Sequence, residues 1–154
     1  MATTDIRDPA LDAPAPADKK APGDLLHCVI VTPETTQLDD VVDFVALPLY
    51  DGELGVLPGR APLIGRLGYG ELRTRTGGLT RRYFVDGGFA QVRDDVVTVL
   101  TNRATPSTLV DATAASKELE LAQSRRASTD TEQADKSRAI ARARAQLRVA
   151  GVRS

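Results

Sequence analysis

The chain has 154 residues, with 20 Lys and Arg against 21 Asp and Glu, and a formal net charge of -1. This balance gives no basic footprint for nucleic acid, so we expect no nucleic-acid partner. A single cysteine, Cys28, and a single histidine, His27, exclude an internal disulfide, a cysteine-based zinc site and a multi-histidine metal site. No apolar run approaches the roughly 18 residues that span a bilayer, so we expect no direct membrane insertion.

Residues 1–23 are rich in Ala, Pro and Asp. Such a segment cannot bury enough apolar surface to offset its chain entropy, which predicts a disordered acidic tail. Its acidity argues against a mitochondrial transit peptide, and it lacks the apolar centre of a secretory signal. We therefore expect a cytoplasmic protein with a flexible N-terminus.

Short β-rich runs separated by turn residues fill residues 24–106. In ELRTRT charged residues alternate with Leu and Thr, which is typical of a strand with one dry and one wet face. Between these runs stand four glycine-containing segments: Asp51-Gly52, Pro58-Gly59, Gly77-Gly78 and Asp86-Gly87-Gly88. Because such segments favour tight turns, the region is predicted to be an antiparallel β-sandwich or barrel.

Residues 107–154 contain no proline and predict two helices joined by a short connection. Asp111 is a candidate N-cap for a first helix over residues 112–127, and a second helix is predicted over residues 132–150. Such helices form an antiparallel hairpin. Apolar positions of the first helix recur at helical spacing, and most are alanine: Ala112, Ala115, Leu119 and Ala122. Since alanine removes little apolar area from water, we expect a weakly held hairpin.

The second helical segment is basic. From Thr131 onward six Lys and Arg stand against two acidic residues, a local charge of +4. A solvated helix face accounts for one charge run of this kind. A weakly packed basic hairpin also favours electrostatic docking on an acidic partner.

The remaining candidates for chemistry have simpler interpretations. His27 and Cys28 are neighbours on a predicted strand and point to opposite faces, so they do not form a catalytic pair. Four aspartates are interpreted as turn residues, since three lack an EF-hand's ligand spacing and the fourth precedes a double glycine: Asp39, Asp40, Asp43 and Asp86. We therefore expect no catalytic residue and no metal site.

The stretch GELGVLPGRAPLIG, residues 52–65, combines glycine and proline with apolar side chains. A phosphate-cradling loop is disfavoured, because no GK[ST] follows and the next segment has a strand pattern. We interpret Gly52, Gly55 and Gly59 as backbone turn positions.

Three stretches resemble, in order and spacing, the epsilon subunit family of rotary (F-type) ATP synthases: LHCVIVTPE, DGELGVLPGRAPLIGRLGYGELR and RYFVDGGFAQVRDDVVTVL. ARAQLRV resembles the second hairpin helix of that family. The likeness covers about residues 25–150, and GELGxLPG followed about thirty residues later by GGF is its most specific part. It implies a β-sandwich of about ten strands over residues 24–106, the rotor-binding domain, and a regulatory two-helix hairpin over residues 107–154.

The resemblance implies a non-catalytic rotor subunit in the central stalk of a proton-translocating ATP synthase, on the cytoplasmic face of the bacterial inner membrane. Its sandwich would link the central-stalk gamma subunit to the polar loops of the membrane c-ring and so transmit torque. The implied interface residues are Glu53, Leu57, Pro58 and Arg60, and Arg60 stands where many members have histidine. The residues do not distinguish H+ from Na+ as the coupling ion.

The hairpin of this family opposes ATP hydrolysis when it extends toward acidic segments of the catalytic beta subunits. The resemblance therefore implies a brake in this chain, with four arginines as its candidate contacts: Arg138, Arg142, Arg144 and Arg148.

Some bacterial members bind ATP in the hairpin through [I/L]-D-x-x-R-A on the first helix and R-A-x-x-R on the second. Here Asp111 is present, but Ala114 stands at the arginine position of the first motif. The second motif survives in Arg144 and Arg148, which four-residue spacing places on one helix face. With half of the cationic clamp missing, we expect weak or no ATP binding and no cofactor, with these three matching residues as residual nucleotide contacts.

Two alternatives remain open. A free-standing nucleotide-sensing or binding module could share the same fold. A small β-sandwich hydrolase is disfavoured, because one histidine, no clustered nucleophile and no metal-ligand set leave it without catalytic groups.

Overall fold

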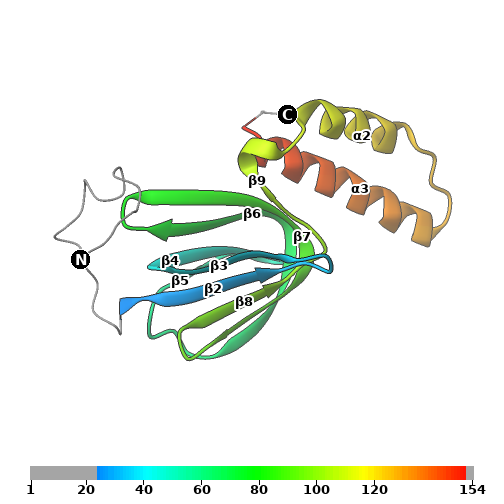
Figure 1. The fold of residues 1–154 in the computed structure, drawn as a ribbon. Coiled ribbons are helices and arrows are strands. Elements are labelled where there is room, and N and C mark those ends of the chain that lie inside the picture. The colour runs from blue at the N-terminus through cyan, green and yellow to red at the C-terminus, as the bar shows by residue number, and fades with distance from the viewer. Residues whose placement is uncertain (1–23, 152–154) are drawn as a thin grey trace.

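The computed structural model describes residues 24–151 (Figure 1). The tail expected over residues 1–23 lies outside the described residues. The strands are β2 (Leu26–Val31), β3 (Thr36–Val42), β4 (Phe44–Leu49), β5 (Gly52–Val56), β6 (Leu63–Thr76), β7 (Leu79–Arg93), β8 (Val96–Leu100) and β9 (Ala104–Pro106). They are followed by a 3-10 helix, η3 (Ser107–Leu109), and by two α-helices, α2 (Ala112–Ser124) and α3 (Asp130–Val149).

The strands form one strongly bent sheet in the order β3-β2-β8-β7-β6-β4-β5, and β9 pairs with β7. The sheet folds over into two layers at the curved strands β6 and β7 (Figure 1). The pairs are antiparallel except for β2 with β8, which is parallel. The β-sandwich followed by two helices is confirmed, with this one parallel pair as a departure from the expected antiparallel arrangement.

The described residues contain eight strands rather than about ten. The reason is that β6 and β7 each span two of the predicted runs without interruption. The glycines between those runs allow close approach instead of a turn. A Cβ at Gly70 would lie 2.9 Å from Cβ of Pro48 in the neighbouring strand β4, and one at Gly88 would lie 1.9 Å from the carbonyl oxygen of Leu100.

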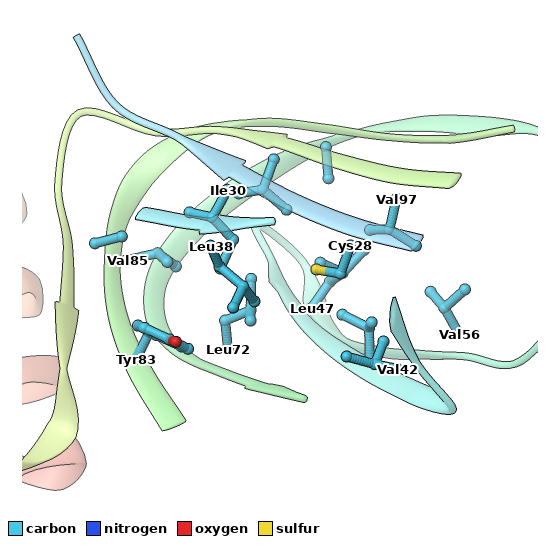
Figure 2. Packing of buried hydrophobic residues seen from close by; sticks show 14 of the residues in the cluster. Cys28, Ile30, Leu38, Val42, Leu47, Val56, Leu72, Tyr83, Val85 and Val97 are labelled. Carbon is cyan, nitrogen blue, oxygen red and sulfur yellow. The ribbon is translucent and has the colours of Figure 1, made fainter. Parts of the chain in front are cut away.

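The core lies between the two layers, where aliphatic side chains from every strand meet (Figure 2). In β2 the alternation is strict at the start, with Leu26, Cys28 and Ile30 buried and the intervening His27 exposed. Full burial of an aliphatic side chain such as Leu26 or Ile30 contributes about 1.5–3 kcal/mol to the free energy of unfolding. The expectation that His27 and Cys28 face opposite sides is confirmed.

The turn positions of GELGVLPG are confirmed in part. Gly52 and Gly59 have φ of +145° and +87°, values that favour glycine. Gly55 has no positive φ, so its interpretation as a turn residue was wrong. A Cβ at Gly55 would lie 3.1 Å from the ring of Phe44, so this glycine makes room for an aromatic side chain.

The aspartates also differ from their interpretation as turn residues. Asp43 does lie at the bend between β3 and β4, where its carboxylate accepts a hydrogen bond of 2.9 Å from the amide of Gly77. Asp39 and Asp40 lie within β3, an edge strand, where Asp39 contacts the ring of His27 in β2 and Asp40 lies 3.6 Å from the guanidinium of Arg81 in β7. The interpretation was wrong for these two, and also for Asp86, which lies inside β7.

The two helices begin and end close to their predicted bounds. Oδ1 of Asp111 accepts a hydrogen bond of 3.0 Å from the amide of Ala114, so the predicted N-cap of α2 is confirmed. A capping box between Thr129 and Glu132 starts α3 two residues earlier than predicted. The amides of Ser128 and Thr129 both donate to the Glu132 carboxylate and lower its pKa.

Candidate functional site

The hairpin is docked on the sandwich through α3, which contacts β6 and β7 (Figure 1). At the centre of this contact the side chain of Phe84 in β7 is fully buried against Ala145 and Val149 of α3. Tyr69 and Val110 pack around the same cluster. Because only one large side chain is enclosed, the apolar contact between hairpin and sandwich is small.

The position of Phe84 follows from the alternation of side chains along β7. Its neighbours Tyr83 and Val85 point into the core between the layers. Phe84 therefore points out of the sandwich, and α3 covers it. The signal available in the sequence is the run of three consecutive apolar residues, Tyr83, Phe84 and Val85, because in a strand with one exposed face the middle one would be polar.

Two residues beyond Phe84, Asp86 lies on the same outer face of β7 and meets Arg142 of α3. Nε of Arg142 lies 2.9 Å from Oδ2 of Asp86, and the two side chains are 32% and 14% exposed. The N–H of Nε does not make a hydrogen bond in this arrangement, so the attraction is one between charges. Asp86 is thus a contact residue between the two parts of the molecule.

The four arginines proposed as hairpin contacts have different surroundings. Arg142 meets Asp86, and Arg138 pairs with Asp135 on its own helix. Arg144 and Arg148 are exposed. An open cleft of about 860 Å³ runs between α3 and the sandwich, and three of these arginines line it together with sandwich residues: Arg138, Arg144, Arg148, Tyr50, Arg66, Tyr69 and Asn102. The structure therefore brings three of the four to one cleft.

The predicted interface segment begins at the hairpin of β4 and β5. Glu53 of β5 is half-exposed and accepts two hydrogen bonds from the guanidinium of Arg73 in β6, at 2.9 and 3.4 Å. Arg73 also donates to Glu71 at 3.3 Å, and these contacts raise the pKa of Arg73. Glu53 is therefore held in one orientation by its own chain.

The loop that follows β5 is fixed by a long-range bond and exposes its side chains. The amide of Gly59 donates to Oδ1 of Asp95, at 2.8 Å, which ties the loop to the turn between β7 and β8. Leu57 and Arg60 are exposed, and Pro58 is half-buried. The loop thus presents an apolar and a cationic side chain to solvent on a rigid support.

A second exposed region was missed at the sequence level. Tyr50, Ile64, Phe89 and Leu100, here called the outer patch, are large apolar side chains left exposed on the sandwich. Phe89 lies opposite Leu100 of β8 on one side and Arg66 of β6 on the other. The guanidinium of Arg66 lies 4.6 Å from the ring centre of Tyr50, which continues the row. The available signal in the sequence was the run FAQV, in which alternation places the aromatic Phe89 on the same face as the polar Gln91 and therefore predicts an exposed ring.

The chemistry-bearing side chains of residues 24–151 do not gather as a metal site would require, since no group of three or more His, Cys, Asp or Glu is suitably placed. Within the same residues, no helix is both long and apolar enough to cross a membrane. Burial, and to a lesser extent Asp40, raises the pKa of the Cys28 thiol to about 12. The candidate site consists of contact surfaces on the sandwich and on the hairpin.

A sandwich that carries an exposed apolar patch and a docked basic hairpin is typical of a protein that acts by binding other proteins. The family model described as ATP synthase, Delta/Epsilon chain, beta-sandwich domain matches residues 25–107, which is more than half of the chain, and the chain belongs to this family. The resemblance to epsilon subunits of ATP synthase, which are non-catalytic stalk subunits, is confirmed.

Curated relatives agree with this assignment. A protein of Rhodopirellula baltica named ATP synthase epsilon chain is 58% identical over 123 residues, covering 80% of this chain and 96% of the relative. One of Nitratidesulfovibrio vulgaris with the same name is 41% identical over 129 residues, covering 82% and 96%.

Solved structures share the fold. A chain of the Euglena gracilis mitochondrial ATP synthase has a TM-score of 0.74 at 24% identity, covering 97% of this chain and 98% of its own. A chain of the Tetrahymena thermophila mitochondrial ATP synthase has a TM-score of 0.67 at 13% identity, covering 81% and 96%.

Proposed function

We propose that the sandwich links the central-stalk gamma subunit to the membrane c-ring of a proton-translocating ATP synthase and transmits torque between them. The observation that carries this proposal is the outer patch, a set of large exposed apolar side chains of the kind that marks a protein interface. The Tetrahymena chain of the same fold comes from a structure titled central stalk and c-ring. We place the gamma subunit on the outer patch and on Arg60.

The proposed contact with the polar loops of the c-ring involves Glu53, Leu57 and Pro58. Glu53 keeps half of its side chain exposed while Arg73 fixes its orientation, which suits a carboxylate that meets polar groups of a partner. An interface with preset side chains loses less conformational entropy on binding. The corresponding location is the cytoplasmic face of the bacterial inner membrane, reached through partners.

Contact through the outer patch is tested by Phe89→Asp, with Leu121→Asp as the matched control. Both side chains are large, apolar and exposed, but Leu121 lies on α2, away from the patch. Placing a charge in an interface core is expected to lower affinity for the gamma subunit by about tenfold or more. Co-purification that is lost in the Phe89 variant and kept in the control supports the proposal, and equal co-purification of both contradicts it.

The hairpin is proposed to act as a brake on ATP hydrolysis. The small apolar contact with the sandwich permits release of α3, which then presents its four arginines to acidic segments of the catalytic beta subunits. In the docked form Arg142 is neutralised by Asp86 and the other three line the cleft. Replacing all four by alanine is expected to relieve inhibition in the assembled enzyme.

ATP binding by the hairpin is proposed to be weak or absent, with no other cofactor. The carboxylate of Asp111 is occupied by the N-cap of α2, and no arginine stands at position 114. Arg144 and Arg148 alone supply the cationic groups of the motif. The alternative, a free-standing nucleotide sensor of the same fold, predicts tight ATP binding in calorimetry and no co-purification with the gamma subunit.

A further inference from the structure

Among the ion pairs of residues 24–151, a single one joins the hairpin to the sandwich. It is the contact of Arg142 with Asp86, whereas each of the others joins two groups within the sandwich or within α3. Release of the hairpin therefore breaks this pair and leaves the others in place.

The burial of this pair sets it apart from an ordinary surface salt bridge. Exposed pairs contribute about 0–1 kcal/mol, because water and salt screen them. Asp86 is only 14% exposed, and it lies two residues from the fully buried Phe84. The pair therefore borders the apolar contact, where little water reaches it. If Arg142 is removed while the hairpin stays docked, the Asp86 carboxylate is left without a counter-ion in this poorly hydrated position, which is unfavourable.

We propose that Asp86 and Arg142 form a latch that holds the hairpin on the sandwich, and that Asp86 competes with the acidic partner for Arg142. In the docked form Arg142 is bound by its own chain. In the released form it joins the basic face of α3. This inference rests on the proposed brake, and it adds the element that sets how often the hairpin leaves the sandwich and can act as the brake.

The docked contact is also built to be reversible. Oε1 of Gln146, one turn beyond Arg142 along α3, is buried without a hydrogen bond. Buried polar atoms of this kind weaken the state that contains them. A partner that binds only the released form can therefore shift the equilibrium with a modest difference in affinity.

The test of the latch measures how often the docked contact opens. Val149→Cys places a reporter thiol in the contact, where it reacts with a thiol reagent only after release. The native Cys28 is buried in the core of the sandwich and stays silent. Asp86→Asn in this background removes the charge while keeping the shape of the side chain, and we expect labelling to accelerate roughly three- to tenfold.

The matched control is Asp94→Asn, which removes another carboxylate from an ion pair, with Arg93 at 3.6 Å, in a different part of the sandwich. It should leave the labelling rate unchanged. An equal rate in Asp86→Asn and in the parent would overturn the latch. A tryptic cleavage assay on α3 gives an independent measure of release, should the reporter alter the contact.

A double-variant cycle separates a direct pair from two independent effects. If the two residues act through each other, Arg142→Gln should accelerate labelling as much as Asp86→Asn, and the double variant no more than either. Effects that multiply in the double variant would overturn the proposal.

The assembled enzyme separates the latch from the brake. Asp86→Asn should lower ATP hydrolysis, because more hairpins are released, whereas Arg142→Gln should not, because it also removes a contact with the partner. Faster labelling with unchanged hydrolysis in Asp86→Asn supports the latch and contradicts the proposed brake. Unchanged labelling overturns the latch whatever the hydrolysis rate.

Discussion

At the scale of single residues, the second glycine of the GGF motif, Gly88, is required by close packing. Gly88 has a φ of +106°, and a Cβ there would lie 1.9 Å from the carbonyl oxygen of Leu100. Gly88→Ala is therefore expected to cost about 3 kcal/mol or more of unfolding free energy in urea. Gly78→Ala, with no atom within 4 Å of the added Cβ, is the control and should change stability by less than about 1 kcal/mol. Equal losses in both variants would contradict this explanation.

The buried thiol of Cys28 makes a prediction about alkaline pH. Its pKa is about 12 in the folded chain because burial disfavours the thiolate, against an ordinary value of 9.0. Above pH 9 the unfolded chain releases this proton and the folded chain keeps it, so stability falls as pH rises, by up to about 1.4 kcal/mol per unit. Cys28→Ala should show a shallower decline of unfolding free energy between pH 9 and pH 10.5 than the parent. An identical decline would contradict the prediction.

At the scale of elements, the two helices and most strands could be predicted, but the continuity of β6 and β7 and the packing partner of each element could not. The helices and the first strand have clear periods, since β2 alternates and α2 carries its alanine stripe. The bend of β6 and β7 was read as turns, because glycine in sequence signals both a turn and a close approach. The contact of Phe84 and Asp86 with α3 lies on the outer face of a strand, and alternation alone does not say what covers that face.

The docking of α3 on β7 depends on one aromatic side chain, which gives a prediction for the hairpin as an element. Phe84→Ala removes the fully buried ring with which the sandwich contacts α3. Because the hairpin can separate, the loss should appear as release, with tryptic cleavage of α3 about tenfold faster. Phe89→Ala removes an exposed ring from the same strand and should leave cleavage unchanged. Equal acceleration by both would contradict the role of Phe84.

At the scale of the whole molecule, the chain combines a rigid sandwich with a hairpin held by a small contact. The sandwich presents the outer patch and the loop of Leu57 and Arg60 on strands with a continuous core. The hairpin contributes a basic helix whose charges are partly neutralised when it is docked. The proposed torque transmission and the proposed brake therefore belong to separate parts of the molecule, and we expect that the hairpin can be removed without loss of the link between stalk and ring.

The most direct test of this division compares the assembled ATP synthase carrying the full chain with one carrying a chain that ends at Val110. That end point keeps β9 and η3 and removes both helices. We predict that truncation raises ATP hydrolysis while synthesis driven by an ion gradient persists, because the brake is lost and the link between stalk and ring remains. Unchanged hydrolysis would contradict the proposed brake, and loss of driven synthesis would contradict the assignment of torque transmission to the sandwich alone.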